Sequence, residues 1–332
     1  MAFWIAFVVC TSVIVYSGSR LSKYGDILAE KTGMGRTWIG LILMASVTSL
    51  PELITGISSV TFANVPDIAV GDVLGSCVFN MLILSFLDAW YRQAPISTKV
   101  HHGNILSGGI GMLLLSIVAI SLFTGHHMNA IAWIGIYSPI FFIIYLIAMK
   151  LIFSYEKRQL AAYMKEVAVE KKYKDITLKA AVSGYGLNAV IVIIAAVFLP
   201  KIGEGLAEMT GLGETFVGNI FIALSTSLPE VVVSIAAVKM DAVNLAIGNL
   251  FGSNIFNIFI LAIDDFLYTQ GPLLLFVNQN HIISALAAIA MTTIAIIGAT
   301  YRAEKKSLFL AWDAIGILTV YVGNLLLLYA LR

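Results

Sequence analysis

Long apolar stretches constrain the fold of this chain more than any other feature of its sequence. Ten such stretches follow one another, most of them close to 20 residues long. A helix needs about 20 apolar residues to span the roughly 30 Å of hydrocarbon in a bilayer, whereas the alternating pattern of a membrane β-barrel is absent. The predicted spans are 2–19, 37–62, 68–90, 103–124, 130–153, 180–199, 215–238, 242–268, 281–301 and 307–330.

Composition agrees with an integral membrane protein. Charged residues make up 12% of the chain and the mean hydropathy is +0.93, whereas soluble proteins carry about 25% charged residues. The formal net charge of +1 indicates neither nucleic acid nor another charged macromolecule as a partner. Cys10 and Cys77 both lie in apolar stretches, which predicts neither a disulfide framework nor a zinc site. Residues 1–16 have no basic start and no cleavage site, so they indicate a first membrane helix rather than a cleaved signal.

Lys and Arg residues predict how the spans are oriented. Nearly all of them lie in the loops that follow the odd-numbered spans, and the largest group lies between residues 157 and 179. Cytoplasmic loops carry such an excess of Lys and Arg. We therefore expect both termini outside and the connecting loop 154–179 in the cytoplasm. This loop divides the chain into a first five-helix repeat, 1–153, and a second, 180–332.

An odd number of spans in each half forces the second half to enter the membrane upside down. The predicted fold class is therefore an all-α membrane protein of ten transmembrane helices, arranged as two inverted five-helix repeats.

One short motif occurs once in each half. Thr-Ser-Leu-Pro-Glu stands at residues 48–52 and again at 226–230, and residues 71–80 match 248–257 further on. Each copy of the motif lies inside an apolar stretch. A glutamate within the hydrocarbon is costly and indicates a functional site. Two of them, contributed by repeated halves, predict a cation site at the centre of a transport protein.

The motif supplies oxygen atoms for such a cation. Proline has no N–H, so Pro51 and Pro229 each leave one backbone carbonyl of the preceding turn without its helical donor. The adjacent Thr and Ser residues add hydroxyls, and the glutamates add charge. Carboxylate, carbonyl and hydroxyl oxygens are the ligands that Ca²⁺ prefers. Glycines four residues apart let helices approach closely, which we expect to bring the downstream Ser and Asn residues next to the glutamates.

These residues resemble the signature of the cation/calcium exchanger superfamily, in particular its microbial sodium/calcium exchanger branch. The resemblance rests on residues 45–80 and 223–257 and on the ten-span layout, so it extends over essentially the whole chain. It implies that Glu52 and Glu230 ligate Ca²⁺. The further ion ligands that it implies are Thr48, Thr226, Ser49, Ser227, the carbonyls of Ala45 and Ala223, Ser76, Ser253, Asn80 and Asn257.

The chain departs from the family pattern at three places. One of the positions matching Asn80 and Asn257 is often Asp in Na⁺-coupled members, whereas both are Asn here. Cys77 stands where the second half has Asn254. Asp72 stands where the second half has Asn249, one turn before Ser76. Asp72 either restores a carboxylate to the ion path or bonds a neighbouring helix.

Three further acids lie near the ends of the third and eighth spans. They are Asp88, Asp264 and Asp265. We expect a cap or interface role for them, with an ion entrance as the alternative.

The resemblance implies a secondary antiporter that exchanges Ca²⁺ for Na⁺ by alternating access. The alternative is an antiporter of the same fold that exchanges H⁺ for Ca²⁺ or another divalent cation. Two glutamates carry two negative charges, which one Ca²⁺, two Na⁺ or two H⁺ neutralise. Three Na⁺ would leave an uncompensated charge in a site of low dielectric constant, unless a third carboxylate is present. We therefore expect two monovalent ions per Ca²⁺, or proton coupling.

Channels and enzymes are the competing classes. A channel needs a continuous pore, and the sequence has neither the Ser/His nor the metalloprotease spacing of an enzyme, so we expect no catalytic activity and no cofactor. The expected partners are the transported Ca²⁺ and Na⁺ (or H⁺) and the lipid bilayer of a prokaryotic cell membrane, and the sequence is compatible with a monomer. We expect the first and sixth helices, with Gly18, Gly184 and Gly186, to slide past the core.

Overall fold

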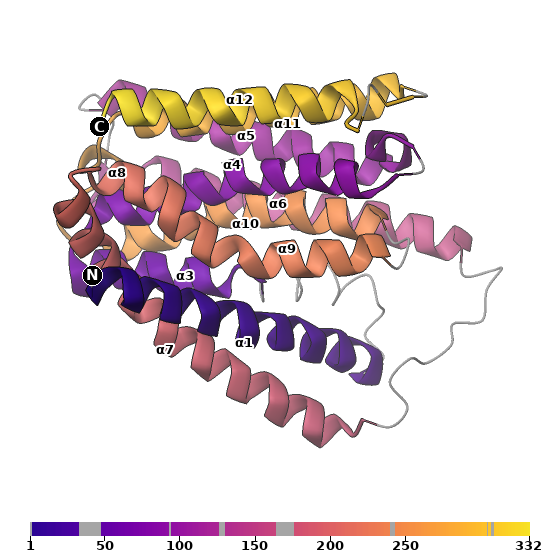
Figure 1. The fold of residues 1–332 in the computed structure, drawn as a ribbon, viewed down its shortest axis with the longest axis horizontal. Coiled ribbons are helices and arrows are strands. Elements are labelled where there is room, and N and C mark those ends of the chain that lie inside the picture. Colours follow the sequence, from indigo (N-terminus) through magenta and orange to yellow (C-terminus); the bar gives the residue numbers. More distant parts are fainter. Residues whose placement is uncertain are drawn as a thin grey trace.

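Almost the whole described chain is helical (Figure 1). The computed structural model describes residues 2–32, 48–92, 94–125, 130–163, 176–239, 243–303, 305–306 and 309–332. Within these ranges, nine helices are long and apolar enough to cross a membrane, and one further apolar helical segment, Leu50–Ala63, is shorter. Strands β1 (Ala130–Ile131) and β2 (Ile134–Gly135) pair antiparallel in a small hairpin.

The helices fall into a first and a second set along the chain. The first set is α1 (Ala2–Thr32), α3 (Leu50–Ser58), the π-helix η1 (Ser59–Ala63), α4 (Pro66–Trp90), the 3₁₀-helix η2 (Ile96–Lys99), α5 (His102–Thr124) and α6 (Tyr137–Tyr163). The second set is α7 (Leu178–Thr210), α8 (Glu214–Val217), the π-helix η4 (Gly218–Ile222), α9 (Ala223–Lys239), α10 (Val243–Leu267), the 3₁₀-helix η5 (Leu273–Leu275), α11 (His281–Tyr301) and α12 (Trp312–Ala330).

Local sequence explains where several helices begin and end. Pro66 opens α4, where its fixed φ suits the first turn and its missing N–H is not needed. Asn64, with φ 57°, reverses the chain between η1 and α4. Thr177 caps α7 by accepting a hydrogen bond from Ala180 N at 3.2 Å. Gly211, with φ 68°, ends α7 in the left-handed conformation that glycine tolerates best.

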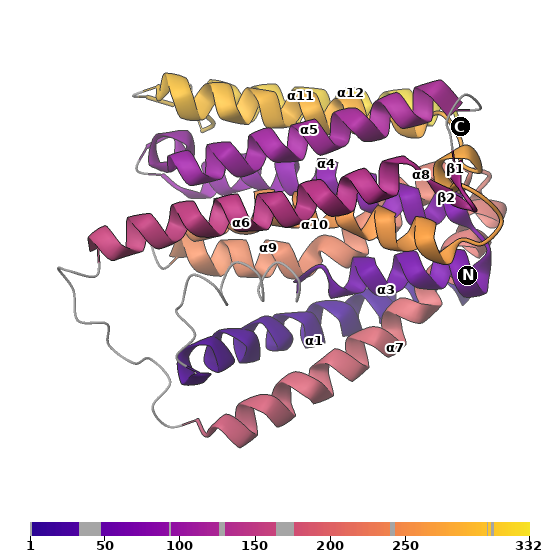
Figure 2. The same ribbon diagram turned by 180° about the vertical axis from the view of Figure 1, so that it is seen from behind.

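Helices α4 and α10 form the centre of the bundle. They pack against each other, and both contact α3 and α9; α4 also contacts α11 and α12, while α10 also contacts α5 and α6. In both, 89% of the most apolar 18-residue window is buried, against 22% for α1 and 28% for α7. Figures 1 and 2 show α1 and α7 along one side of the bundle and α11 and α12 along the opposite side. Both chain termini lie at one end of the bundle, while α6 ends and α7 begins at the other.

The outer helices α1 and α7 pack mainly on each other. They contain 31 and 33 residues and run in opposite directions. The ring of Phe3 lies against Gly205 at one end of the pair, and the ring of Tyr24 lies against Gly184 at the other. A side chain at either glycine would overlap the ring, so these contacts need a bare backbone.

Several predicted boundaries are wrong because the helices continue past the apolar core of each span. The predicted ends at 19, 153 and 199 are observed at Thr32, Tyr163 and Thr210. Pro200 lies inside α7 without ending it. The added turns contain Glu, Lys, Ala and Leu, which favour helix although their charges lower the hydropathy. The predicted span 37–62 is described only from residue 48 onward, and residues 164–175 of the predicted loop lie outside the described residues.

Candidate ion-binding site

The two glutamates of the repeated motif meet in the interior. Glu52 on α3 and Glu230 on α9 are 0% and 1% exposed. Ser227 Oγ donates a hydrogen bond to Glu52 Oε1 at 3.0 Å, and Ser49 Oγ donates to Glu230 Oε1 at 3.2 Å. The serine of each motif thus bonds the glutamate of the other motif, which joins the two copies face to face.

Glu230 has additional hydroxyl donors. Thr48 hydrogen-bonds it, and Ser253 Oγ on α10 donates to Glu230 Oε1 at 3.4 Å. Oε2 of each glutamate is buried and has no hydrogen-bond partner among the described residues. Such an oxygen costs free energy when it is left unsatisfied, so both atoms are suited to bind a cation.

Asp72 brings a third carboxylate to this centre. Its side chain is fully buried, and Thr226 Oγ1 donates to Asp72 Oδ1 at 2.7 Å. Glu52 and Glu230 both interact electrostatically with it. Within the described part of the chain, no Lys, Arg or His approaches these three carboxylates within ion-pair distance, since the pairs there involve Glu204, Asp67 and Asp88 instead. The centre is therefore acidic and has no fixed counter-charge.

The remaining predicted ligands lie on the same central helices. Ser76 and Asn80 on α4 and Ser253 and Asn257 on α10 are all fully buried. Asn80 Nδ2 donates to Asn254 Oδ1 at 2.9 Å, and Asn254 Nδ2 donates to the Cys77 carbonyl at 3.4 Å. These bonds hold α4 and α10 together where they pass the glutamates. The carbonyl of Ala223 accepts from Thr226 Oγ1 at 3.2 Å, while Ala45 lies outside the described residues.

Glycines explain why α4 comes so close to the second half. A Cβ at Gly71 would lie 3.0 Å from the Cα of Gly218, and one at Gly75 would lie 2.6 Å from the Cα of Asn219. The predicted close approach is confirmed for this pair. Gly248, the counterpart of Gly71, instead faces the side chain of Asn104, whose Oδ1 would be 3.2 Å from an added Cβ.

Asp88 and Asp265 occupy equivalent places in the two halves and hold the loops that follow α4 and α10. Asp88 accepts from the backbone N–H groups of Ile96 at 2.7 Å and Ala311 at 2.8 Å. Asp265 accepts from Gly135 N at 2.9 Å and from Tyr137 Oη at 2.6 Å. The predicted cap role is therefore confirmed for both. Asp264 caps no loop, because it accepts no hydrogen bond from any described residue, and only the predicted interface role holds for it, since its carboxylate lies against Gly56 of α3.

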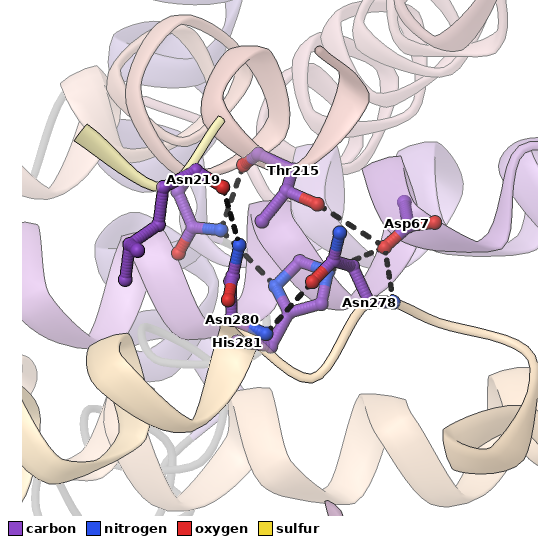
Figure 3. Close-up of polar contacts among 7 residues, drawn as sticks. Asp67, Thr215, Asn219, Asn278, Asn280 and His281 are labelled. Carbon is purple, nitrogen blue, oxygen red and sulfur yellow. Dashed lines mark hydrogen bonds and ion pairs between the residues drawn. The ribbon is translucent and has the colours of Figure 1, made fainter. Parts of the chain in front are cut away.

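Sequence reasoning missed a polar cluster at the end of the bundle where the termini lie (Figure 3). Asp67 Oδ1, at the start of α4, accepts from Asn278 N at 2.7 Å and contacts Nε2 of the buried His281 at 2.9 Å. The other ring nitrogen of His281 lies 3.1 Å from Nδ2 of Asn219 in η4. The cluster ties α4 to the second half. No spacing in the sequence connects residues that lie so far apart along the chain.

Comparisons with known proteins agree with this architecture. The model of the family described as sodium/calcium exchanger protein matches residues 2–151 and 181–330. Inner membrane protein YrbG of Escherichia coli is 29% identical over 263 residues, which cover 79% of this chain and 78% of that protein. Sodium/calcium exchanger MaX1 of Methanosarcina acetivorans is 24% identical over 95% of both chains.

Solved structures share the fold. The sodium-calcium exchanger NCX_Mj, soaked with Na⁺ and Sr²⁺, gives a TM-score of 0.60 at 21% identity over 97% of both chains. The H⁺/Ca²⁺ exchanger CAX gives 0.70 at 13% identity, over 98% of this chain and 82% of that one. The chain belongs to the sodium/calcium exchanger protein family and is a multi-pass transmembrane antiporter of the cell membrane.

Proposed function

We propose that this protein exchanges Ca²⁺ for Na⁺ by alternating access. The observation that carries the proposal is the reciprocal bonding of the two motifs, in which Ser49 and Ser227 each donate to the glutamate of the other half. Each glutamate keeps one buried oxygen without a donor. When a cation enters, these hydroxyls can turn their oxygens toward it, and the same set then supplies the hard ligands that Ca²⁺ and Na⁺ require.

The proposed ligands have separate tasks. Glu52 and Glu230 neutralise Ca²⁺, with Thr48 and Thr226 as further ligands. The remaining oxygens complete the Na⁺ sites, and they come from Ser49, Ser227, Ala45, Ala223, Ser76, Ser253, Asn80 and Asn257. Asp72 adds a third negative charge beside Thr226. With this third carboxylate, three Na⁺ balance the charge of the site. We therefore propose an exchange of three Na⁺ per Ca²⁺, which carries current, rather than one limited to two Na⁺.

We further propose ten membrane helices in two inverted repeats, 1–153 and 180–332, with the loop 154–179 in the cytoplasm and both termini outside. The two separate matches of the family model and the loop distribution of Lys and Arg support this arrangement. We propose that one copy of the chain suffices, because both motifs of the site come from the same chain.

Alternating access needs elements that move while the centre stays packed, and α1 and α7 are the proposed ones. Among the candidate spans of the described residues, α1 has the smallest buried share, 22%, and α7 follows at 28%, the same share as α6 and α12. On α1, Gly18 lies against the ring of Pro229, where an added Cβ would be 2.8 Å from Cγ, and Thr11 Oγ1 lies 2.8 Å from Ser225 Oγ. A shift of α1 along its axis would therefore change contacts of α9 next to Glu230.

Proton coupling is the second candidate function. The specific observation in its favour is a centre of three buried carboxylates with no Lys, Arg or His within ion-pair distance among the described residues. Protons neutralise such carboxylates as well as Na⁺ does. The H⁺/Ca²⁺ exchanger CAX shares the fold of this chain, which also supports this candidate.

Exchange by the purified protein in sealed vesicles separates them. We expect uptake of ⁴⁵Ca²⁺ when Na⁺ is loaded inside and diluted outside, and none from a pH gradient of equal size. Glu230→Gln is the inactive control, and Glu204→Gln, which removes a partly exposed carboxylate paired with Lys201, is the matched active one. Uptake driven by the pH gradient alone would replace Na⁺ by H⁺ as the coupling ion, and the absence of uptake under both gradients would overturn the proposal.

A further inference from the structure

Asp264 is a buried carboxylate outside the central site. It lies near the end of α10, has no exposed surface, and neither of its oxygens accepts a hydrogen bond from a described residue. Its sequence neighbour Asp265 has both oxygens bonded, for example to Gly135 N and Leu273 N. Leaving a carboxylate buried and without donors is costly, and a bound cation removes that cost.

The carboxylate of Asp264 rests on the backbone of α3, one turn beyond Glu52. A Cβ at Gly56 would lie 2.8 Å from Asp264 Oδ1, so the absence of a side chain there makes room for the acid. Glu52, Thr55 and Gly56 are three and four residues apart and therefore share one face of α3. The hydroxyl of Thr55 is also buried and has no hydrogen-bond partner among the described residues.

This group lies between the central glutamates and the end of the bundle that holds both termini. Gln270, just after α10, donates to Asn64, just after η1, at 2.7 Å, so α3 with η1 and α10 end on the same side. Gly56 lies four residues, about 6 Å, beyond Glu52 in that direction. Helix α4 runs in the opposite direction to α3. Asp72, four residues before Ser76 in α4, therefore also lies nearer to the end that holds the termini. Asp72 is also the acid with the largest electrostatic effect on Asp264.

We infer that Asp264, Asp72 and the Thr55 hydroxyl form a second cation site, next to the central one and on the side of the termini. Two carboxylates and a hydroxyl are hard oxygen ligands of the kind that a divalent cation such as Ca²⁺ prefers. Asp72, which Thr226 already bonds from the centre, links the two sites. The inference rests on the proposed function. It adds to that function a second Ca²⁺ position, which lies between the central glutamates and the end of the bundle that holds the termini.

Equilibrium binding of ⁴⁵Ca²⁺ to the full-length protein in detergent tests the inference. We expect two Ca²⁺ per chain in the wild type, one in Glu52→Gln, and none in Glu52→Gln/Asp264→Asn. Asp313→Asn is the matched control added to Glu52→Gln, because Asp313 is likewise a buried acid packed on a glycine, Gly298, but lies beside the Asp88 end of α4. Thermal unfolding of each variant verifies that it is folded.

Thr55→Val keeps the shape of the side chain and removes only the hydroxyl, so it tests the site even where Asp264→Asn does not fold. Added to Glu52→Gln, it is expected to weaken the remaining Ca²⁺ binding about tenfold. If Ca²⁺ binding by Glu52→Gln does not change when Asp264→Asn or Thr55→Val is added, the second site is overturned and the central site is unaffected. Two Ca²⁺ per chain in Glu52→Gln would instead overturn the proposed function, so the two failures are distinguishable.

Discussion

The two halves of the centre have nearly the same sequence but unequal hydrogen bonding. Glu230 accepts from the hydroxyls of Thr48, Ser49 and Ser253, whereas Glu52 accepts from Ser227. Thr226, the counterpart of Thr48, bonds Asp72 instead of a glutamate. The repeat has Asn249 where Asp72 stands.

A single change from amide to acid therefore redirects one threonine and leaves Glu52 with fewer donors. A further buried acid, Asp264, also packs against this half, since its carboxylate lies on Gly56 of α3. Where Asp264 stands in one half, the other has Leu87, and the counterpart of Gly56 is Ser234. Duplication supplies two matched scaffolds, and a few substitutions gather the additional negative charge around Glu52.

The largest expected effect comes from removing either glutamate. Glu52→Gln and Glu230→Gln should each lower Na⁺-driven ⁴⁵Ca²⁺ uptake by about 100-fold or more. Each variant removes one charged ligand of the bound Ca²⁺, and removing one partner of a buried ion pair costs ~3–5 kcal/mol. The comparison between halves predicts that Glu230→Gln also lowers the thermal stability more, since three hydroxyls lose their charged acceptor. If either variant transported Ca²⁺ as fast as the wild type, the two glutamates would have a structural role instead.

Exchanging the acid and the amide between the halves tests the asymmetry directly. Asp72→Asn makes the first half resemble the second and removes one of three negative charges, so the current carried per Ca²⁺ should fall to about zero as the coupling drops to two Na⁺. Voltage-clamped vesicles measure it, with Asp313→Asn as the control for a distant buried acid. A current per Ca²⁺ that Asp72→Asn leaves unchanged would exclude Asp72 from charge balance.

The hydroxyls should have smaller and unequal effects. Ser227→Ala removes the hydroxyl that bonds Glu52, and a lost hydrogen bond to a charged group costs ~1.5–3 kcal/mol. We expect a roughly tenfold or greater rise in the Na⁺ concentration for half-maximal exchange. Ser49→Ala should raise it less, because Thr48 and Ser253 still bond Glu230. The reverse order of the two variants would contradict the unequal halves.

The smallest effect concerns packing at the matched glycines. Gly71→Ala would press a methyl group against the backbone of Gly218 and is expected to lower the unfolding temperature by several degrees, as overpacking costs ~1–3 kcal/mol. Gly248→Ala meets only the side chain of Asn104, which can shift, so its unfolding temperature should stay close to that of the wild type. Fluorescence-detected melting in detergent measures both, and equal melting temperatures would contradict the difference.

Sequence alone predicts the parts of the centre that the repeat marks. Both glutamates, their hydroxyl neighbours and the close approach at Gly71 follow from a motif that occurs twice in apolar surroundings. The bond from Thr226 to Asp72 does not follow, since it joins residues 154 positions apart and depends on how α4 crosses α9. The sequence also does not distinguish Asp264 from its neighbour Asp265. Neighbouring residues on a helix point in different directions, and only the packing shows which one finds donors.

Hydropathy alone does not predict the full length of α1 and α7, and this length has a consequence for the membrane. At 31 and 33 residues and 1.5 Å per residue, they are about 46–50 Å long, well beyond the roughly 30 Å of hydrocarbon. Such helices must tilt or emerge into the headgroups, and their tilt follows membrane thickness. Turnover should therefore depend on the acyl chain length of the surrounding lipids, which makes the membrane itself a regulator of the transport cycle.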